Sequence, residues 1–226
     1  MKKFIIENLK TIFYALVIAI IIRSLLIQPF YIPSSSMEPN LLVGDRLFVT
    51  KYSYGYSKHS FPFSPPLFKD RILFSEPKRG DIIVFKTPAD NRTDYIKRLI
   101  GLPGDKIQFI NGDLYINNTQ VIKNKVENLP LELNCGDSEC FAFEEKLPEG
   151  VTYNTIYRKH NGYSETREFN VPEDQYFFLG DNRDNSRDSR YLAGGPGYVN
   201  KVDLVGKARI IFFSNERKKG SFLKFW

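Results

Sequence analysis

The order of apolar and polar positions separates one long apolar run near the start of the chain from many short strand-like segments after it. Residues 11–27 are mostly apolar, with Arg23 as the single charged residue. A run of about 17–25 such residues can cross a bilayer as a helix, and an arginine near its end can reach the interface with its long side chain. We therefore predict a transmembrane anchor over residues 11–27, preceded by a short cytoplasmic segment, residues 1–10.

Short segments with strand patterns follow the anchor. Residues 45–52 and 94–100 alternate between apolar and polar positions, whereas residues 81–85 and 176–179 are continuous apolar runs, typical of strands buried on both faces. Asn111-Gly112 separates two further apolar segments, which is a strong hairpin signal. Weaker strand candidates are residues 151–158, 162–169 and 208–213, while the aromatic, proline-rich residues 54–74 are expected to form an irregular loop. The predicted fold is all-β with mostly antiparallel sheets, behind one N-terminal transmembrane helix.

Composition and charge support this interpretation. The chain contains 19 Phe and 13 Tyr, and aromatic residues favour strands. It carries 32 Lys and Arg against 26 Asp and Glu, a net charge of +6. These charges are spread along the chain, so we do not expect a nucleic-acid partner, and attraction to anionic lipid headgroups is the simpler use of the excess. The basic and aromatic tail, residues 217–226, is typical of an interfacial anchor.

The N-terminal run has a second interpretation, a cleaved secretory signal, which shares the basic start and apolar middle. Such a signal needs a small-x-small site shortly after the apolar run, and Ser34-x-Ser36 lies too far downstream. We therefore expect an uncleaved anchor. Lys2, Lys3 and Lys10 place the N-terminus in the cytoplasm and the rest of the chain outside.

The two cysteines, Cys135 and Cys140, flank a short turn sequence. In an oxidising compartment they can close a small disulfide loop, and free thiols are the alternative. A zinc site needs four ligands, but His59 and His160 are isolated from each other and from the cysteines. We expect no metal and no cofactor.

Three consecutive serines between two prolines, in PSSSMEPNL at residues 33–41, follow the anchor directly. A flexible linker would be rich in Gly and Ser and polar, whereas apolar residues flank this stretch. A stiff turn that presents a hydroxyl suits a nucleophile. The alternative is a membrane-exit turn with surface serines.

A serine nucleophile needs a base, and Lys97 is the candidate. Because side chains alternate along a strand, Lys97 shares a face with Tyr95 and Leu99, and Arg98 points the opposite way. Burial between apolar neighbours lowers the pKa of a lysine, and a useful base has a pKa of roughly 7–8. The alternative is a lysine that pairs with a carboxylate or reaches solvent at a sheet edge. A Ser-His-Asp site is not expected, because both histidines lie in polar, turn-like sequence.

Four motifs in this order resemble those of bacterial type I signal peptidase (leader peptidase), a serine protease family with a Ser/Lys pair. They are PSSSMEPNL at 33–41, RGDIIVF at 79–85, DYIKRLIGLPGD at 94–105 and GDNRDNSRDSR at 180–190. The resemblance implies a β catalytic core in two parts, residues 28–106 and 173–226, with a smaller β region, residues 107–172, inserted between them. Ser35 stands where many members have Gly.

The resemblance also implies roles for individual residues. Ser36 matches the nucleophile and Lys97 the general base, while Ser34 and the backbone N–H of Ser36 match the oxyanion hole. Further matches are Ser186 as the group that hydrogen-bonds and orients the lysine, Asp188 and Arg190 as a supporting ion pair, and Gly180 as a position where the chain passes close to the lysine. Residues implied to line shallow pockets for an extended substrate are Ile32, Pro33, Met37, Leu41, Tyr95 and Ile96.

The activity so implied is removal of N-terminal signal peptides after small-x-small sites, through an acyl-enzyme. The expected partners are signal peptides of exported pre-proteins and the lipid bilayer. The expected location is the bacterial inner membrane, with a single pass and a periplasmic catalytic domain. The oligomeric state is left open, with a monomer as the expectation.

Two other classes of protein share parts of this pattern. An inactive membrane-tethered β domain would bind extended peptides without cutting them, but it would not need Ser34, Ser36 and Lys97 together. A self-cleaving Ser/Lys repressor would be a soluble chain with a helix-turn-helix, and neither feature is present in the sequence.

Overall fold

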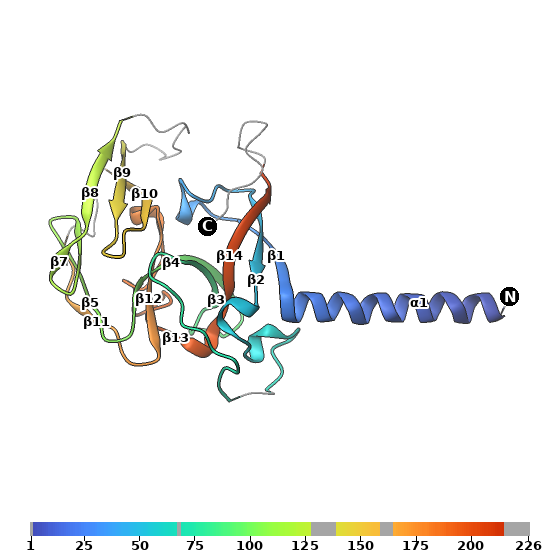
Figure 1. Ribbon diagram of the computed structural model, residues 1–226. Coiled ribbons are helices and arrows are strands. Elements are labelled where there is room, and N and C mark those ends of the chain that lie inside the picture. Colours follow the sequence, from blue (N-terminus) through green and yellow to red (C-terminus); the bar gives the residue numbers. More distant parts are fainter. Residues whose placement is uncertain (1, 67–68, 128–138, 159–164, 215–226) are drawn as a thin grey trace.

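The computed structural model describes residues 2–66, 69–127, 139–158 and 165–214, and it consists of one projecting helix and a β body (Figure 1). The helix α1 (Lys2–Ile21) continues into a π-helical turn, η1 (Ile22–Leu26). Residues Lys3–Leu26 form a helical stretch long and apolar enough to cross a membrane, with a mean hydropathy of 2.1. The helix thus begins earlier than predicted, and Ile27 already belongs to the first strand.

The β body contains three antiparallel sheets, which confirms the all-β prediction. Its strands are β1 (Ile27–Tyr31), β2 (Arg46–Thr50), β3 (Ile82–Lys86), β4 (Asp94–Gly101), β5 (Lys106–Ile110), β6 (Asp113–Ile116), β7 (Thr119–Gln120), β8 (Ile122–Val126), β9 (Cys140–Lys146), β10 (Thr152–Arg158), β11 (Phe169–Asn170), β12 (Gln175–Leu179), β13 (Val199–Asn200) and β14 (Leu204–Phe213). The main sheet has the order β1-β2-β14-β3-β4-β12-β13, and the two smaller sheets have the orders β10-β9-β8 and β11-β5-β6-β7.

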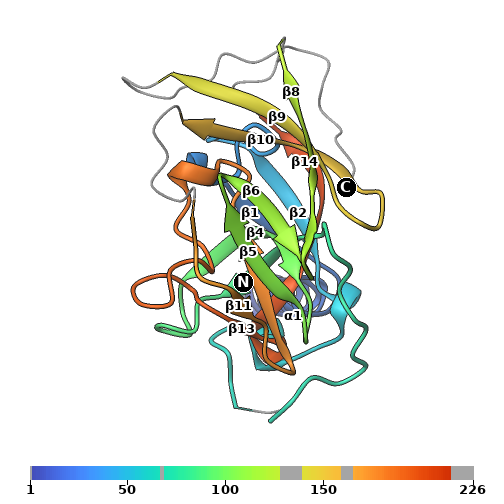
Figure 2. The ribbon, with the colours of Figure 1, turned by 90° about the vertical axis from the view of Figure 1, so that its left-hand side faces the viewer.

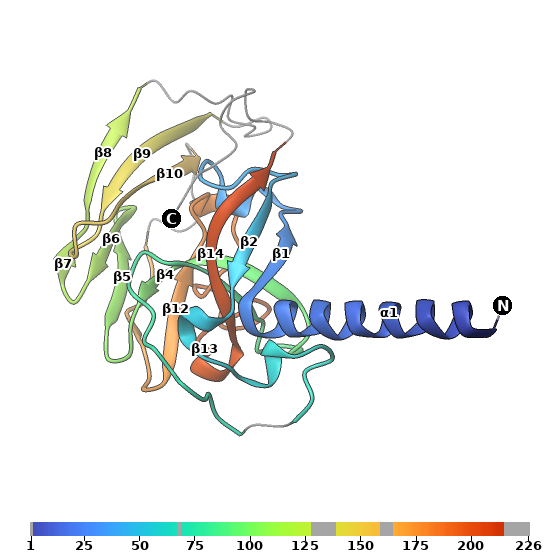
Figure 3. The same ribbon diagram turned by 45° about the vertical axis from the view of Figure 1, so that its right-hand side comes forward.

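The main sheet is buried on both faces at its centre. Along β3, Ile82 and Val84 pack into one apolar cluster and Ile83 and Phe85 into another. This arrangement confirms the buried strand that the continuous apolar run predicts. The edge strand β1 pairs with β2, and β14 lies on the other side of β2 (Figure 3).

The two smaller sheets are built from strands between Lys106 and Asn170. Asn111 and Gly112 both have positive φ, 51° and 80°, as the tight β5–β6 hairpin requires. In Figure 2, β8, β9 and β10 lie together at one end of the body. Sequence patterns did not predict β8 or β9. Cys135, His160, the tail 217–226 and part of the strand candidate 162–169 lie outside the described residues, so the disulfide and the interfacial tail stay predictions.

Candidate active site

The serine stretch forms a short 3₁₀ turn, η2 (Ser35–Met37), just after β1. The flanking apolar residues pack this turn onto the core, because Met37 and Leu41 are fully buried in the same apolar cluster as Ile32. The backbone N–H of Leu41 donates to the carbonyl oxygen of Met37 at 2.9 Å. The loop is therefore fastened to the main sheet and is not a free linker.

Lys97 reaches this turn from β4. Its Nζ donates to the Ser36 Oγ at 2.5 Å, and the two residues are only 5% and 7% exposed. Tyr95 lies on the same side of the strand, with its ring centroid 5.6 Å from the Lys97 Nζ, as the alternation of side chains predicts. Within the part of the chain that the structure describes, no carboxylate lies within ion-pair distance of the Lys97 ammonium.

Burial controls the charge of Lys97. It lowers the pKa of the ammonium from 10.5 to about 8, against a weaker opposing effect of the Asp188 and Asp181 carboxylates. At pH 7 about one Lys97 in ten is then neutral, against roughly one in 3,000 for a lysine with an ordinary pKa. A neutral amine in contact with a hydroxyl can accept its proton.

A second hydroxyl lies beside the first. The Ser34 Oγ is 3.3 Å from the Ser36 Oγ, and Ser34 is exposed whereas Ser36 is buried. The Ser34 hydroxyl therefore lies next to Ser36 and is open to solvent, and its role as an oxyanion donor stays a prediction.

The loop 180–190 packs against the other side of the serine turn. A Cβ built on Gly180 would clash with the Ser186 side chain and lie 2.5 Å from the Ser36 carbonyl oxygen. The chain therefore makes a close approach at Gly180, as the resemblance implies. The residues that it approaches are Ser36 and Ser186, whereas the resemblance implies the lysine. The Ser186 Oγ is buried, and its interaction with the Asp188 carboxylate helps to lower the pKa of that carboxyl. No hydrogen bond joins it to Lys97 among the residues that the structure describes, so the contact that the resemblance implies is not formed in this structure.

Asp188 and Arg190 form a buried ion pair, with Nε–Oδ1 and Nη2–Oδ2 distances of 2.8 and 2.9 Å. Burial raises the pKa of the Asp188 carboxyl, but the Arg190 guanidinium and the N–H of Gly180, which donates to it at 3.0 Å, outweigh burial and leave that pKa below its ordinary value. Asp188 therefore stays charged and fixes the start of the loop.

Two asparagines of this loop contact the serine turn, and no sequence pattern predicted these contacts. The Asn182 N–H donates to the Ser36 carbonyl oxygen at 3.1 Å, and the Asn182 side-chain amide donates to the Ser35 carbonyl oxygen at 3.2 Å. The Asn185 amide donates to the Ser35 hydroxyl at 2.6 Å. Ser35, which replaces the glycine common in the resembling family, thus has a hydrogen-bond partner of its own.

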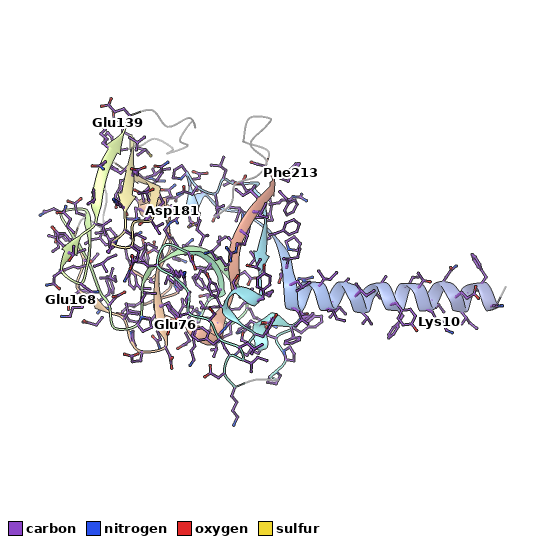
Figure 4. The ribbon with its side chains drawn as sticks, in the orientation of Figure 1. Lys10, Glu76, Glu139, Glu168, Asp181 and Phe213 are labelled. Carbon is purple, nitrogen blue, oxygen red and sulfur yellow. The ribbon has the colours of Figure 1, made fainter. Side chains whose placement is uncertain are left out.

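The sequence patterns also did not predict two buried ion pairs near the loop 180–190. Arg98 donates to both carboxylate oxygens of Asp181 at 2.7 Å, and Asn40 donates to the same carboxylate at 2.8 Å (Figure 4 labels Asp181). Arg183 and Glu145 form a second buried pair, and the hydroxyls of two tyrosines complete it. A dense cluster of charged residues next to a buried strand, as in residues 180–190, indicates that buried ion pairs are present. It does not indicate which residues pair with which.

The residues implied to line substrate pockets have different environments. Ile32, Met37 and Leu41 are at most 2% exposed, so they can form only the floor of a pocket. Tyr95 and Ile96 are half-buried on β4, and Pro33 is exposed beside the serine turn. Their contact with substrate stays a prediction.

His59 belongs to a different part of the molecule. It is buried, its Nδ1 lies 2.9 Å from the Ser64 Oγ, and its Nε2 lies 3.3 Å from the Asp203 carboxylate. The side chain is thus more enclosed than its polar, turn-like sequence suggests. These partners involve neither Ser36 nor Lys97.

Known proteins with this sequence pattern are signal peptidases. The family model for signal peptidase, peptidase S26, matches residues 5–213. The chain is 44% identical over 214 residues to signal peptidase I of Rickettsia typhi, covering 90% of this chain and 78% of that protein. It is 45% identical over 214 residues to signal peptidase I of Rickettsia conorii, covering 90% and 77%. A crystal structure of a signal peptidase I from Enterococcus faecalis V583 is 27% identical, with a TM-score of 0.34 and coverage of 59% of this chain and 97% of that one. The chain therefore belongs to the signal peptidase family, peptidase S26, whose members cleave signal peptides.

Proposed function

We propose that the chain is a membrane-tethered Ser/Lys endopeptidase in which neutral Lys97 activates Ser36. The observation that carries the proposal is the 2.5 Å contact between the Lys97 Nζ and the Ser36 Oγ, made by a lysine whose pKa burial lowers to about 8. A lysine held in an ion pair would keep its proton and could not act as a base. The burial of Lys97 away from carboxylate partners therefore favours catalysis over a structural role.

The reaction proceeds in two steps. Lys97 accepts the Ser36 proton while the Ser36 oxygen attacks the scissile carbonyl, and the Ser34 hydroxyl and the Ser36 N–H donate to the resulting oxyanion. The intermediate then releases the new amino terminus of the mature protein, which takes the proton from Lys97 and leaves an acyl-enzyme on Ser36. Lys97 next deprotonates a water molecule, which attacks the ester. The signal peptide leaves with a free carboxylate as the protonated Lys97 returns its proton to the Ser36 oxygen, which restores the starting enzyme.

The substrates on this proposal are pre-proteins with small residues at positions −1 and −3, bound in extended form beside β4. The helix α1 crosses the bacterial inner membrane once, with Lys2, Lys3 and Lys10 at its cytoplasmic end. The β body then lies on the periplasmic side. The Asp188–Arg190 pair fixes the shape of the loop 180–190. Asn182 and Asn185 of that loop hold the serine turn through the Ser36 and Ser35 carbonyl oxygens and the Ser35 hydroxyl.

Cleavage of a pre-protein with an Ala-x-Ala site by the detergent-solubilised full chain tests this proposal. Wild type is compared with Ser36→Ala, Lys97→Met and, as a matched control, Ser75→Ala at an exposed serine. We expect wild type and Ser75→Ala to cut after the second Ala, and both site variants to be inactive while their thermal unfolding midpoints remain near that of wild type. Full activity of Lys97→Met would overturn the proposed base, and peptide binding by wild type without cleavage would favour a receptor.

A further inference from the structure

A cavity separate from the serine site lies where the apolar helix enters the β body. Its volume is about 390 Å³. Arg23 contributes to it from η1, Phe30 from β1, Lys51 from the end of β2 and Arg92 from the β3–β4 turn. The backbone N–H of Lys51 donates to the carbonyl oxygen of Leu26, the last residue of η1, at 2.9 Å. The cavity is thus joined directly to the end of the helix.

Positive charge dominates this cavity. Arg23, Lys51, Lys86 and Arg92 line it, against the single carboxylate of Asp94. That carboxylate already pairs with Lys86, with an Nζ–Oδ1 distance of 2.9 Å. Three cations are therefore left without a carboxylate partner among the residues that the structure describes.

Lys51 gives independent evidence that an anion belongs here. It is only 2% exposed, yet the one hydrogen bond that its ammonium makes with described residues is a long contact of 3.3 Å to the His59 carbonyl oxygen. Burial lowers the pKa of this ammonium to about 8, and the Asp94 carboxylate, which lies beyond ion-pair distance, opposes this only in part. A buried cation without an anionic partner is costly, and a bound anion in the cavity would remove that cost.

The surroundings of the cavity indicate the kind of anion. Phe61, Pro62 and Phe63 form part of its wall, and the Phe63 side chain is fully exposed. Exposed apolar side chains of η1, Ile22 and Leu26, flank the cavity-lining Arg23, and exposed apolar side chains continue along α1. In Figure 1 α1 projects from the β body. A molecule that fits both features has a phosphate group joined to long apolar chains.

We propose that this cavity binds the phosphodiester of an anionic phospholipid, whose acyl chains lie along α1. The proposal rests on the membrane-spanning role of α1 given above, but not on the catalytic chemistry. Lys51 and Arg92 donate to the two non-bridging phosphate oxygens, and Arg23 binds at the rim near the bilayer surface. The lipid holds the β body in a set orientation next to the bilayer.

Native mass spectrometry of the full chain in neutral detergent, titrated with phosphatidylglycerol or phosphatidylcholine, tests this site. We expect wild type to bind phosphatidylglycerol at least about tenfold more tightly than phosphatidylcholine, and Lys51→Met to lose roughly tenfold in that affinity, since a charged hydrogen bond is lost. Arg92→Gln, a change at an exposed residue, should lose affinity in the same direction. Lys146→Met, at an exposed lysine of β9, should bind like wild type.

Thermal unfolding separates a binding role of Lys51 from a structural one. Without lipid, Lys51→Met should unfold at the same temperature as wild type or higher, because it removes an unpaired buried charge. Phosphatidylglycerol should raise the unfolding temperature of wild type by binding the folded state, but not that of Lys51→Met. A lower unfolding temperature for Lys51→Met with an unchanged lipid effect would overturn the proposal.

Further outcomes distinguish a lipid phosphate from free phosphate, and a failure of the lipid site from a failure of the proposed enzyme activity. If inorganic phosphate binds wild type and the lipid does not, the site takes free phosphate and the lipid proposal is wrong. Equal affinities of wild type for the two lipids would also refute it. Wild type is assayed in the same detergent for cleavage of the Ala-x-Ala pre-protein, so an active enzyme without lipid preference refutes only the lipid site.

Discussion

Replacing Gly180 by Ala tests whether the close contact between the loop 180–190 and the serine turn positions the nucleophile. The added Cβ would lie 2.5 Å from the Ser36 carbonyl oxygen and would also clash with the Ser186 side chain. Ordinary contacts of a Cβ begin at 3.4 Å, so the two segments must separate by about 1 Å, a displacement that can cost a catalytic site roughly 100-fold in rate. Overpacking of this kind also costs about 1–3 kcal/mol of stability.

The assay is steady-state cleavage of an Ala-x-Ala substrate, combined with thermal unfolding. We expect Gly180→Ala to reduce kcat/KM about 100-fold and to remain folded at the assay temperature. Gly101→Ala is the matched control, because its Cβ would meet the Phe177 Cβ at 2.8 Å and the Val171 Cγ2 at 2.9 Å, in the core away from the serine turn. It should lose similar stability and much less activity. Equal losses of activity in the two variants would show that the contact at Gly180 is only structural.

Three other predictions concern charge and hydrogen bonding. The value of kcat/KM should rise with pH and level off above about 8, the pKa to which burial lowers Lys97, because only the neutral amine accepts a proton; a pH titration measures this. Glu145→Gln should lower the free energy of unfolding by about 3–5 kcal/mol in urea denaturation, since Arg183 then lacks its anionic partner. Asn185→Ala should reduce kcat/KM roughly 2–10-fold through loss of its hydrogen bond to the Ser35 hydroxyl, and Ser35→Ala added to it should cost little more.

Each of these predictions has an outcome that contradicts it. A flat pH profile between about pH 6 and 10 would exclude a lysine base with a lowered pKa. For the buried pair, Glu144→Gln at the exposed neighbouring position is the control, and equal destabilisation by both changes would argue against a special role of the ion pair. Additive losses in the asparagine and serine variants would mean that the two side chains act independently.

The order of motifs, through the family resemblance, selected Ser36 and Lys97, and strand alternation placed Lys97 on one face with Tyr95. The lysine had to share a face with Tyr95, and the structure places the Lys97 Nζ near that ring and against the Ser36 hydroxyl. The shared face of Lys97 and Tyr95 is a local feature, because it depends on the period of a single strand. The contact with Ser36 joins residues 61 positions apart, and only the family's motifs implied it.

The partners of the loop 180–190 could not be predicted in the same way. Asn182 and Asn185 reach Ser35 across a sequence separation of about 150 residues, and this contact depends on how two distant segments pack. The sequence patterns did not predict the strand β1 for another reason. The apolar run assigned to the helix includes Ile27, the first residue of β1, and Gln28 and Pro29 interrupt the pattern after it. Pro29 is tolerated in it because β1 lies at the edge of the sheet.

The strand β1 has a consequence for which bond of a substrate can be cut. It supplies 5 of the residues between the end of the apolar helix and the serine turn, roughly 17 Å of extended chain. Residues 32–34 complete the connection, and the register of β1 with β2 prevents the strand from sliding. With α1 embedded as proposed, Ser36 is therefore held at a constant height above the bilayer. A substrate that leaves the bilayer as an extended chain must span the same height before its scissile bond meets Ser36. The enzyme then selects substrates by the length of chain between their apolar segment and the cleavage site, in addition to the size of the side chains at that site.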